Sequence, residues 1–330
     1  MIWLTWRQHR KQALYTLAGL LALAAMIVPT GLAMRDTYAD KGLPACFEGL
    51  KGGSLAPEAS ITCMRALDAF NDQYASLTFA GVLLLVLPLL VGLFWGAPLV
   101  ARETEQGTHR LVWTQGVSRR HWALVKVGAV GGFTLAVATV YGLGTTWWME
   151  PLTQTGLLSR FESGLFDMQG IAPIGYTLFA VALGVFAGTV WHKVLPAMGV
   201  ALAGFAGLRI ALTLLVRPRY MPAKVRTYPV EGSTGERGNL TGDWVLAKQV
   251  RNPDGTVAAT NAEVACPPGV SGPGGSPCGS GLGLQAGAYN WQQYQPGDRF
   301  WLFQSIETGI FVALAVVLLY LAIRRVRRIA

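Results

Sequence analysis

The sequence predicts an all-α polytopic membrane protein with six transmembrane helices, cytoplasmic termini and a small disulfide-bonded module outside the membrane. Of its 330 residues, 52% are hydrophobic and 14% are charged, whereas about 25% are charged in soluble domains. Six apolar runs each reach the roughly 20 residues that cross a bilayer as a helix. Basic residues and cysteines are distributed unequally between these runs. Core helices of a soluble protein would not need six runs of this length, so we set that alternative aside.

The six runs divide the chain into spans and connecting segments. The predicted spans are residues 13–34, 77–100, 124–149, 171–191, 194–216 and 302–323. The other segments are an N-terminal segment (1–12), outer loops (35–76 and 150–170), a cytoplasmic loop (101–123), an extracytoplasmic module (217–301) and a basic cytoplasmic tail (324–330). Pro29 and Pro88 lie inside predicted spans and are expected to kink them.

Lysine and arginine residues concentrate on one side of the predicted spans. They are Arg7, Arg10, Lys11, Arg102, Arg110, Arg119, Arg120, Lys193, Arg324, Arg325, Arg327 and Arg328. The short loops of the other side, 35–76 and 150–170, hold more acidic than basic residues. The positive-inside rule therefore places both termini in the cytoplasm. The formal net charge of +9 is first of all a topology signal. The basic tail suits contact with anionic lipid headgroups, and little supports nucleic-acid binding.

All four cysteines lie in two segments assigned to the outside. Cys46 and Cys63 share one outer loop, and Cys266 and Cys278 share the 217–301 module. Cysteine pairs in an oxidising compartment indicate disulfides, most simply Cys46–Cys63 and Cys266–Cys278. A metal site is the alternative, but neither segment contains histidine and the spacings differ from zinc motifs.

The first predicted span follows a short segment that is rich in tryptophan and basic residues. Trp3, Trp6 and Arg7 suit an interfacial helix that leads into the span; the alternative is a plain basic flank. A cleaved signal peptide is a further alternative, because small residues follow near Gly31. However, the 22 apolar residues of 13–34 exceed the usual signal-peptide core, and cleavage would leave an odd number of spans. We therefore expect this span to be retained.

The 217–301 module contains one clear strand–turn–strand pattern. Residues 244–258 hold two β-prone runs around Asn252-Pro-Asp-Gly255, which predicts a β-hairpin. The segment 267–287 is expected to be irregular and held by a disulfide. Aromatic residues then gather where the module meets the last span, as in the aromatic belts of membrane interfaces. They are Tyr289, Trp291, Tyr294, Phe300, Trp301 and Phe303.

Pairs of glycines four residues apart recur in the predicted spans. They are Gly92/Gly96, Gly128/Gly132 and Gly184/Gly188. Such pairs place small residues on one helix face and allow two helices to approach closely. Each pair alone is a weak signal, because glycine is common in these spans.

Two ionisable residues lie inside predicted spans at matching depths. Arg209 precedes the outer end of the fifth span, and Glu307 follows the outer start of the sixth. At 1.5 Å per residue these depths are about 10 Å and 8 Å. Because intramembrane charges usually pair or line a cavity, we expect an Arg209–Glu307 pair. The alternative is that each side chain reaches separately to the nearby interface.

The 101–123 loop is a polar connector between two apolar runs. Glu103 and Glu105 flank the expected start of a short helix, and Gly107-Thr108 would break or recap it. A second, basic turn before the third span holds Arg119 and Arg120. From these residues alone, a solvated connector and a docking surface for a soluble partner explain the loop equally well.

Two stretches of this loop form a recognisable pattern. They are Arg102-Glu-Thr-Glu-Gln-Gly-Thr108 and Trp113-Thr-Gln-Gly-Val-Ser-Arg-Arg120, followed by Lys126. The pattern resembles the first cytoplasmic loop of ABC-2 type permeases, the membrane subunits of bacterial ABC exporters. The Trp3-Leu-Thr-Trp-Arg-Gln8 start and the junction 294–309 resemble a bacterial subgroup of that family. The outer module is larger than the short re-entrant segment typical of the family, so it indicates no substrate.

The resemblance implies a bacterial plasma-membrane exporter with two permease subunits and two separate ATPase subunits. ATP and Mg²⁺ would bind to the ATPase, while this chain, which has no P-loop pattern, would bind no cofactor and have no catalytic site. The 101–123 loop would transmit closure of the ATPase to the spans, with a smaller contact from the His192-Lys193 turn. The expected ATPase contacts are Glu103, Glu105, Arg119 and Arg120, with Gly107 and Thr108 shaping the loop.

Two other classes of protein remain open. A membrane-bound enzyme would need a constellation of histidine and acidic residues, which the predicted spans lack. A non-transporting sensor or anchor, whose outer module binds a ligand, would keep the ATPase partner but not translocation.

Overall fold

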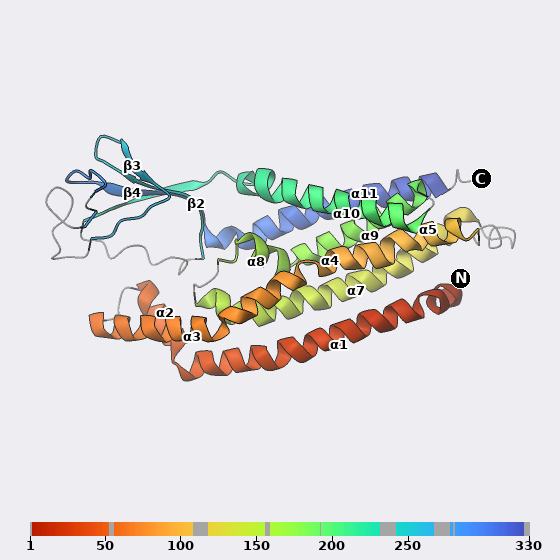
Figure 1. Ribbon diagram of the computed structural model, residues 1–330, viewed down its shortest axis with the longest axis horizontal. Coiled ribbons are helices and arrows are strands. Elements are labelled where there is room, and N and C mark those ends of the chain that lie inside the picture. The colour runs from red at the N-terminus through yellow and green to blue at the C-terminus, as the bar shows by residue number, and fades with distance from the viewer. Residues whose placement is uncertain are drawn as a thin grey trace.

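The computed structural model describes residues 2–52, 56–107, 118–155, 159–191, 193–231, 242–266, 278–279 and 281–326. Long helices lie side by side along the molecule, and a β-sheet extends from one end (Figure 1). The two termini lie at the opposite end (Figure 1). The described chain is therefore mostly helical, with one small sheet formed by residues between 224 and 295.

The helices follow the apolar runs of the sequence. The long helices are α1 (Ile2–Asp40), α3 (Pro57–Leu84), α7 (Arg119–Gln154), α9 (Ala172–Val190), α10 (Val194–Ala211) and α11 (Phe300–Val326). The shorter pieces are α2 (Leu43–Gly52), α4 (Leu87–Val91), η1 (Gly92–Gly96), α5 (Ala97–Glu105), α8 (Ser163–Met168), η2 (Leu212–Val216), η3 (Arg217–Arg219) and η5 (Gly297–Arg299).

Five helices in the described part of the chain are long and apolar enough to cross a membrane. They cover Arg7–Asp40, His121–Gln154, Ala172–Val190, Val194–Arg219 and Gly297–Val326. Large apolar side chains such as Leu21, Leu195 and Val316 are exposed on them. Lipid accommodates such a surface, whereas water disfavours it. The chain is therefore a multi-pass membrane protein.

The predicted span 77–100 is not one uninterrupted helix. α3 ends at Leu84, and α4, the π-helical turn η1 and α5 then continue along the bundle (Figure 1). Pro88 explains the break, because it has no amide hydrogen to donate to the carbonyl of Leu84 four residues earlier. The hydroxyl of Tyr141 on α7 donates to that carbonyl instead, at 2.9 Å. A neighbouring helix thus completes the backbone hydrogen bonding that proline prevents.

α9 is the central helix of the bundle. Inside the protein, 72% of its most apolar stretch is buried, against 17–33% for the other candidate spans. It packs against α4, η1, α5, α7, α10 and α11. The bundle is therefore built around α9, and the other long helices present most of their surface to the surroundings.

Two of the predicted glycine pairs meet where α9 packs against η1 and α5. A Cβ added to Gly92 would lie 2.4 Å from the Cβ of Ala180, and one added to Gly184 would lie 2.6 Å from the amide nitrogen of Ala97. Such separations leave no room for a side chain, so the backbones touch as small-residue motifs allow. The pair Gly128/Gly132 on α7 differs, because an added Cβ there would meet nothing within 4 Å.

The sheet has four antiparallel strands in the order β1-β4-β2-β3. The strands are β1 (Lys224–Pro229), β2 (Trp244–Arg251), β3 (Val257–Thr260) and β4 (Tyr289–Gln295). The hairpin predicted from the sequence is β2–β3, and Gly255 in its turn has a φ of +85°, which favours glycine. Tyr289, Trp291 and Tyr294, expected at the membrane interface, lie in β4, which pairs with both β1 and β2.

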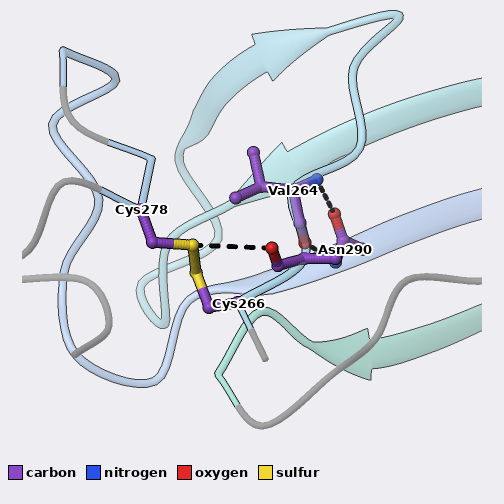
Figure 2. The surroundings of a disulfide bond; sticks show 5 residues. Val264, Cys266, Cys278 and Asn290 are labelled. Atoms are coloured by element: carbon purple, nitrogen blue, oxygen red, sulfur yellow. Dashed lines mark hydrogen bonds between the residues drawn. A yellow bond between two sulfur atoms is a disulfide. The ribbon is translucent and has the colours of Figure 1, made fainter. Parts of the chain in front are cut away.

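Two disulfides link residues outside the five candidate spans, Cys46 to Cys63 and Cys266 to Cys278. The first joins α2 to α3, and Figure 2 shows the second beside the sheet. There the Asn290 side chain of β4 accepts a hydrogen bond from the Val264 amide at 3.0 Å and donates to its carbonyl at 2.8 Å (Figure 2). The segment before Cys266 is thereby fixed to β4.

A buried aromatic cluster joins the sheet to the helices. The Phe161 ring stacks on Trp244 of β2 with 5.7 Å between centroids, and it meets Phe300 and Phe303 of α11 edge to face. Phe161 and Phe303 are fully buried. Aromatic pairs in these geometries add to the free energy of burial, so this cluster holds the sheet at the start of α11.

Candidate functional site

The predicted loop residues lie at the end of the bundle opposite the sheet. Glu103 and Glu105 lie in the last turn of α5, and not at the start of a helix as expected. Gly107, with a φ of +67°, follows the end of this helix. A carboxylate near a helix C-terminus interacts unfavourably with the helix dipole. Contacts with other elements must therefore hold these two side chains in place.

Glu103 faces the interior of the protein. Only 8% of its surface is exposed, and its carboxylate forms an ion pair with Lys126 of α7, which is 5% exposed. The Lys126 ammonium also lies 5.0 Å from the centroid of the Trp122 ring. Removing one partner of such a buried pair is strongly destabilising. Glu103 therefore ties α5 to α7, and its burial makes it a poor surface for a soluble partner.

Glu105 contacts a different helix. Its Oε2 accepts a hydrogen bond from the amide of Val194, the first residue of α10, at 3.1 Å. Amides at a helix N-terminus lack partners within their helix, so a carboxylate there is favourable. Residues that are two positions apart on an α-helix are separated by about 200° around its axis. The Glu-x-Glu spacing thus directs one carboxylate to α7 and the other to α10.

The other predicted contact residues lie at or beyond the edge of the described chain. Thr108 and His192 are outside the described residues, as is the stretch 109–117. Arg119 and Arg120 begin α7, and their side chains are also outside the described part. Ser118 is the N-cap of α7 and accepts a hydrogen bond from the His121 amide at 3.2 Å, which fixes where the helix begins.

A second group of charged residues is buried at the sheet end of the bundle. We call Asp167, Arg209, Arg217 and Glu307 the buried ion cluster. Arg217 donates from Nε and Nη2 to the two oxygens of Glu307 at 2.8 and 2.7 Å, and from Nη2 to Asp167 Oδ1 at 2.6 Å. Arg209 Nη2 lies 2.5 Å from the other oxygen of Asp167. Two positive and two negative charges balance, which lowers the cost of burying them.

The cluster corrects the predicted Arg209–Glu307 pair. Both residues belong to the cluster, but Arg209 pairs with Asp167 and Glu307 pairs with Arg217. Sequence reasoning missed Asp167 and Arg217, because one falls in a predicted outer loop and the other just beyond the fifth span. Asp167 did carry a signal, since it interrupts the apolar run Leu165-Phe-Asp-Met168. Its helix α8 packs against α9, which brings the carboxylate to the two arginines.

Tyrosine hydroxyls complete the surroundings of the cluster. Tyr176 of α9 donates to Glu307 Oε1 at 2.6 Å, and its oxygen lies 3.0 Å from Asp167 Oδ1. Tyr220 donates to Glu307 Oε2 at 3.2 Å. Burial raises the pKa of Tyr220, and the negative charge of Glu307 raises it further. Tyr220 therefore acts as a neutral donor, and both hydroxyls help to solvate the buried carboxylates.

A buried glutamine next to the cluster joins three helices. Gln304 of α11 accepts a hydrogen bond from the Ala172 amide at the start of α9, and it donates to the Phe166 carbonyl on α8, both at 2.8 Å. These groups lie at or near helix ends, where the backbone needs partners from elsewhere. The turn between α8 and α9 contains Gly170, with a φ of +67°, and an added Cβ there would lie 2.9 Å from Gln304 Oε1. A residue with a side chain would displace this contact.

Together these contacts hold α8, α9, α10, η3 and α11 in fixed positions relative to one another. The cluster offers no exposed charge to a ligand, because its four members are buried or nearly so. In the part of the chain that the structure describes, no group of three or more histidine, cysteine or acidic side chains is placed to hold a metal ion. The arrangement at the sheet end is therefore one of internal support, whereas at the end of α5 two acids link separate helices.

A comparison with protein families supports the resemblance seen in the loop. The model of the family described as ABC-2 membrane transporter related matches residues 17–217. This range includes α5, the 101–123 loop and three members of the buried ion cluster. No curated protein and no solved structure matches the chain significantly. Because the match covers more than half of the 330 residues, the chain belongs to the ABC-2 membrane transporter-related family.

Proposed function

We propose that this chain is the permease subunit of an ATP-driven exporter in a bacterial plasma membrane. It forms the translocation path together with a second permease subunit, and a separate ATPase subunit binds and hydrolyses ATP with Mg²⁺. Family membership supports this proposal. So does the sequence, which lacks the phosphate-binding loop that a chain hydrolysing ATP would need.

The proposed topology has six crossings, with both termini in the cytoplasm. Five crossings are the candidate spans, and the sixth is the broken segment from the end of α3 through α5. This segment runs between the two ends of the bundle (Figure 1). An even number of crossings agrees with termini at the same end. The basic residues of the loop ends and the tail favour the cytoplasm for that end.

The single observation that carries the coupling proposal is the pair of acids at the end of α5. Glu103 is ion-paired with α7, and Glu105 binds the N-terminus of α10. An ATPase that moves the 101–123 loop would therefore displace α5, α7 and α10 together. We assign the direct contact to Glu105, Thr108, Arg119 and Arg120, with Gly107 ending the helix before the contact. Glu103 acts inside the protein, as the link that passes the movement to α7.

Co-purification tests the coupling surface. We expect the chain, extracted in mild detergent, to retain a polypeptide that contains a P-loop and hydrolyses ATP. Arg119→Glu with Arg120→Glu should reduce the amount of co-purified ATPase at least fivefold and leave membrane insertion intact. The reason is that the introduced acids would repel the acidic groups of the ATPase that the two arginines are proposed to contact.

A matched control reverses two exposed cations at the sheet end, Arg65→Glu with Lys224→Glu. This variant should retain the ATPase at the wild-type level. Equal retention by the loop variant would contradict the coupling role of Arg119 and Arg120. A complex that forms but moves no substrate would instead favour a sensor or anchor whose outer module binds a ligand.

A further inference from the structure

A cavity of about 420 Å³ lies between α1 and the broken span. Leu20 and Leu23 of α1, Leu87 and Val91 of α4, and Val137 of α7 contribute to its wall. None of the lining residues is charged. Its volume falls within the range of ligand sites, which are usually apolar with a few polar groups. The cavity does not overlap either of the charged groups described above.

The cavity exists because α1 is fastened to the bundle on both sides of it. Towards the N-terminus, Gln12 donates to the Phe94 carbonyl at 3.2 Å, and the Trp95 indole donates to Thr16 at 3.1 Å. Further along α1, the Trp148 indole donates to the hydroxyl of Thr30 at 2.9 Å. Between these two attachments α1 packs against α7, and the cavity separates it from α4.

Gly19 widens the gap between the two attachments. It is part of the cavity wall, and a Cβ added to it would meet nothing within 4 Å. Phe94 and Leu90 at the cavity are exposed, so the cavity is open at the surface of a membrane-spanning region. The medium there is hydrocarbon, and not water.

The size of the cavity favours an acyl chain over a transmembrane helix as its occupant. One turn of an α-helix is 5.4 Å long and about 10 Å wide, which amounts to roughly 420 Å³. The cavity can therefore hold one turn of a helix but not a transmembrane helix of a second copy. A flexible acyl chain can follow the narrow space between α1 and α4, and each buried methylene contributes about 0.8 kcal/mol.

The basic residues beside the cavity favour an amphiphile with an anionic headgroup. Arg7, Arg10 and Lys11 are exposed in the first turns of α1. Lys11 precedes the lining residue Tyr15 by four positions, so the two lie on the same face of the helix. Basic residues beside a membrane attract anionic lipids by about 1 kcal/mol each. An amphiphile with its tail in the cavity would meet these cations with its headgroup.

We propose that this cavity binds one acyl chain of an anionic phospholipid, whose phosphate lies near Arg7, Arg10 and Lys11. The tail lies along Gly19 to Leu23 of α1 and Leu87 to Val91 of α4. The bound lipid fills the gap between α1 and the broken span. This proposal does not rest on transport or on an ATPase, so its outcome is independent of the proposed function.

Photolabelling of the full chain in vesicles tests the site. The probe is phosphatidylglycerol with a diazirine in one acyl chain, at about 1% in phosphatidylcholine, and mass spectrometry locates the label. We expect label on residues 12–23 and 87–95 in preference to the exposed faces of α10 and α11. Phosphatidylcholine with the same diazirine chain should label these residues at least threefold less, because its headgroup carries no net negative charge.

Two glycine variants separate filling of the cavity from general effects. Gly19→Phe should reduce labelling of both segments at least fivefold, because its ring occupies the space of the tail. Gly132→Phe is the matched control: Gly132 also has open space around it but is not part of the cavity wall, so its labelling should match the wild type. Gly19→Leu, a smaller change, should give an intermediate loss and serves if the phenylalanine variant does not fold.

The headgroup half of the proposal has its own variant. Arg10→Glu with Lys11→Glu should abolish the preference for phosphatidylglycerol while leaving some labelling by the neutral probe. Unchanged labelling in Gly19→Phe, or label spread evenly over all exposed helices, would overturn the site. Cross-linking of α1 to a second copy of the chain, in place of lipid, would assign the cavity to a protein contact and overturn it as well.

Discussion

The side chains of Glu307 and Arg217 are 0% and 1% exposed, yet both carry charge. The two stabilise each other; Asp167 also accepts from Arg217, and the hydroxyls of Tyr176 and Tyr220 donate to Glu307. The cost of removing both charges from water is therefore offset locally. The balance depends on having equal numbers of positive and negative groups in the buried ion cluster. Removing one group leaves another charge buried without compensation, which is the source of the first prediction.

Glu307→Gln should lower the free energy of unfolding by about 3–5 kcal/mol. The variant leaves two arginines with one carboxylate. The measurement is denaturant or thermal unfolding of the purified chain in detergent. Glu58→Gln, at an exposed position in α3, is the control and should behave like the wild type. A Glu307→Gln variant within 0.5 kcal/mol of the wild type would contradict this description of the cluster.

The double variant Arg217→Met with Glu307→Gln refines the same prediction. It leaves the neutral Arg209–Asp167 pair, so its loss of stability should be smaller than the sum of the two single losses. Residues in contact show coupling energies of about 0.5–3 kcal/mol. Strictly additive losses would indicate that the two residues do not act as a pair.

At the scale of helices, the contact between α9 and the broken span depends on glycine. Gly184→Ala places a Cβ 2.6 Å from the Ala97 amide nitrogen and 2.8 Å from the Gly92 carbonyl oxygen. Both are backbone atoms, so the helices must move apart. We expect a loss of about 1–3 kcal/mol, as for other overpacked sites, measured by unfolding in detergent.

Gly132→Ala on α7 is the matched control for this contact. An added Cβ meets nothing within 4 Å there, so the variant should be neutral or slightly more stable, because alanine favours a helix over glycine. If both alanine variants had the same stability, close packing of α9 would not be what the glycine pairs provide.

The Cys266–Cys278 disulfide is expected to stabilise the sheet locally. The two cysteines are 12 residues apart in sequence, and closing such a loop stabilises a fold by about 3 kcal/mol in the chain-entropy model. Replacing both by serine should increase hydrogen exchange in β1 and β4 and leave α9 unchanged. Replacing Cys46 and Cys63 should instead affect α2 and α3. Faster exchange throughout the helices in the first variant would contradict a local role.

Elements that depend on local sequence patterns could be predicted, whereas elements that depend on contacts between distant residues could not. The candidate spans follow from local apolar runs, and the β2–β3 hairpin follows from the local Asn-Pro-Asp-Gly turn. β4 could not be predicted in this way, because its residues pair with residues 38 to 70 positions earlier in the chain. The break at Pro88 was predicted as a kink, but its rescue by Tyr141 depends on a contact between helices.

The candidate site shows the same division. Glu103 and Glu105 were recognised by their pattern, but a helix was expected to start beside them, whereas both lie in the last turn of α5. Their opposite directions follow from their spacing of two residues on that helix. Arg209 and Glu307 were recognised because charge is rare within spans. Their true partners were not, because α8 and η3 are too short to give a periodic signal.

At the scale of the whole molecule, topology gives a further prediction. Green fluorescent protein fused after Val326 should fluoresce, because the proposed topology places that end in the cytoplasm. Alkaline phosphatase inserted after Asp254, in the β2–β3 turn, should be active, because the sheet is proposed to lie outside. Inactive phosphatase at this turn, together with active phosphatase fused after Val326, would contradict the proposed topology and indicate the opposite orientation.

Transport by the purified complex in sealed vesicles tests most directly whether this chain is the permease of an ATP-driven exporter. The complex of this chain with its co-purified ATPase is reconstituted, and labelled compounds are taken from those to which cells lacking the chain become sensitive. Uptake into vesicles with the ATPase outside should require hydrolysable ATP, and it should fall at least tenfold with Arg119→Glu and Arg120→Glu. Uptake that persists without any ATPase subunit would contradict the proposed function.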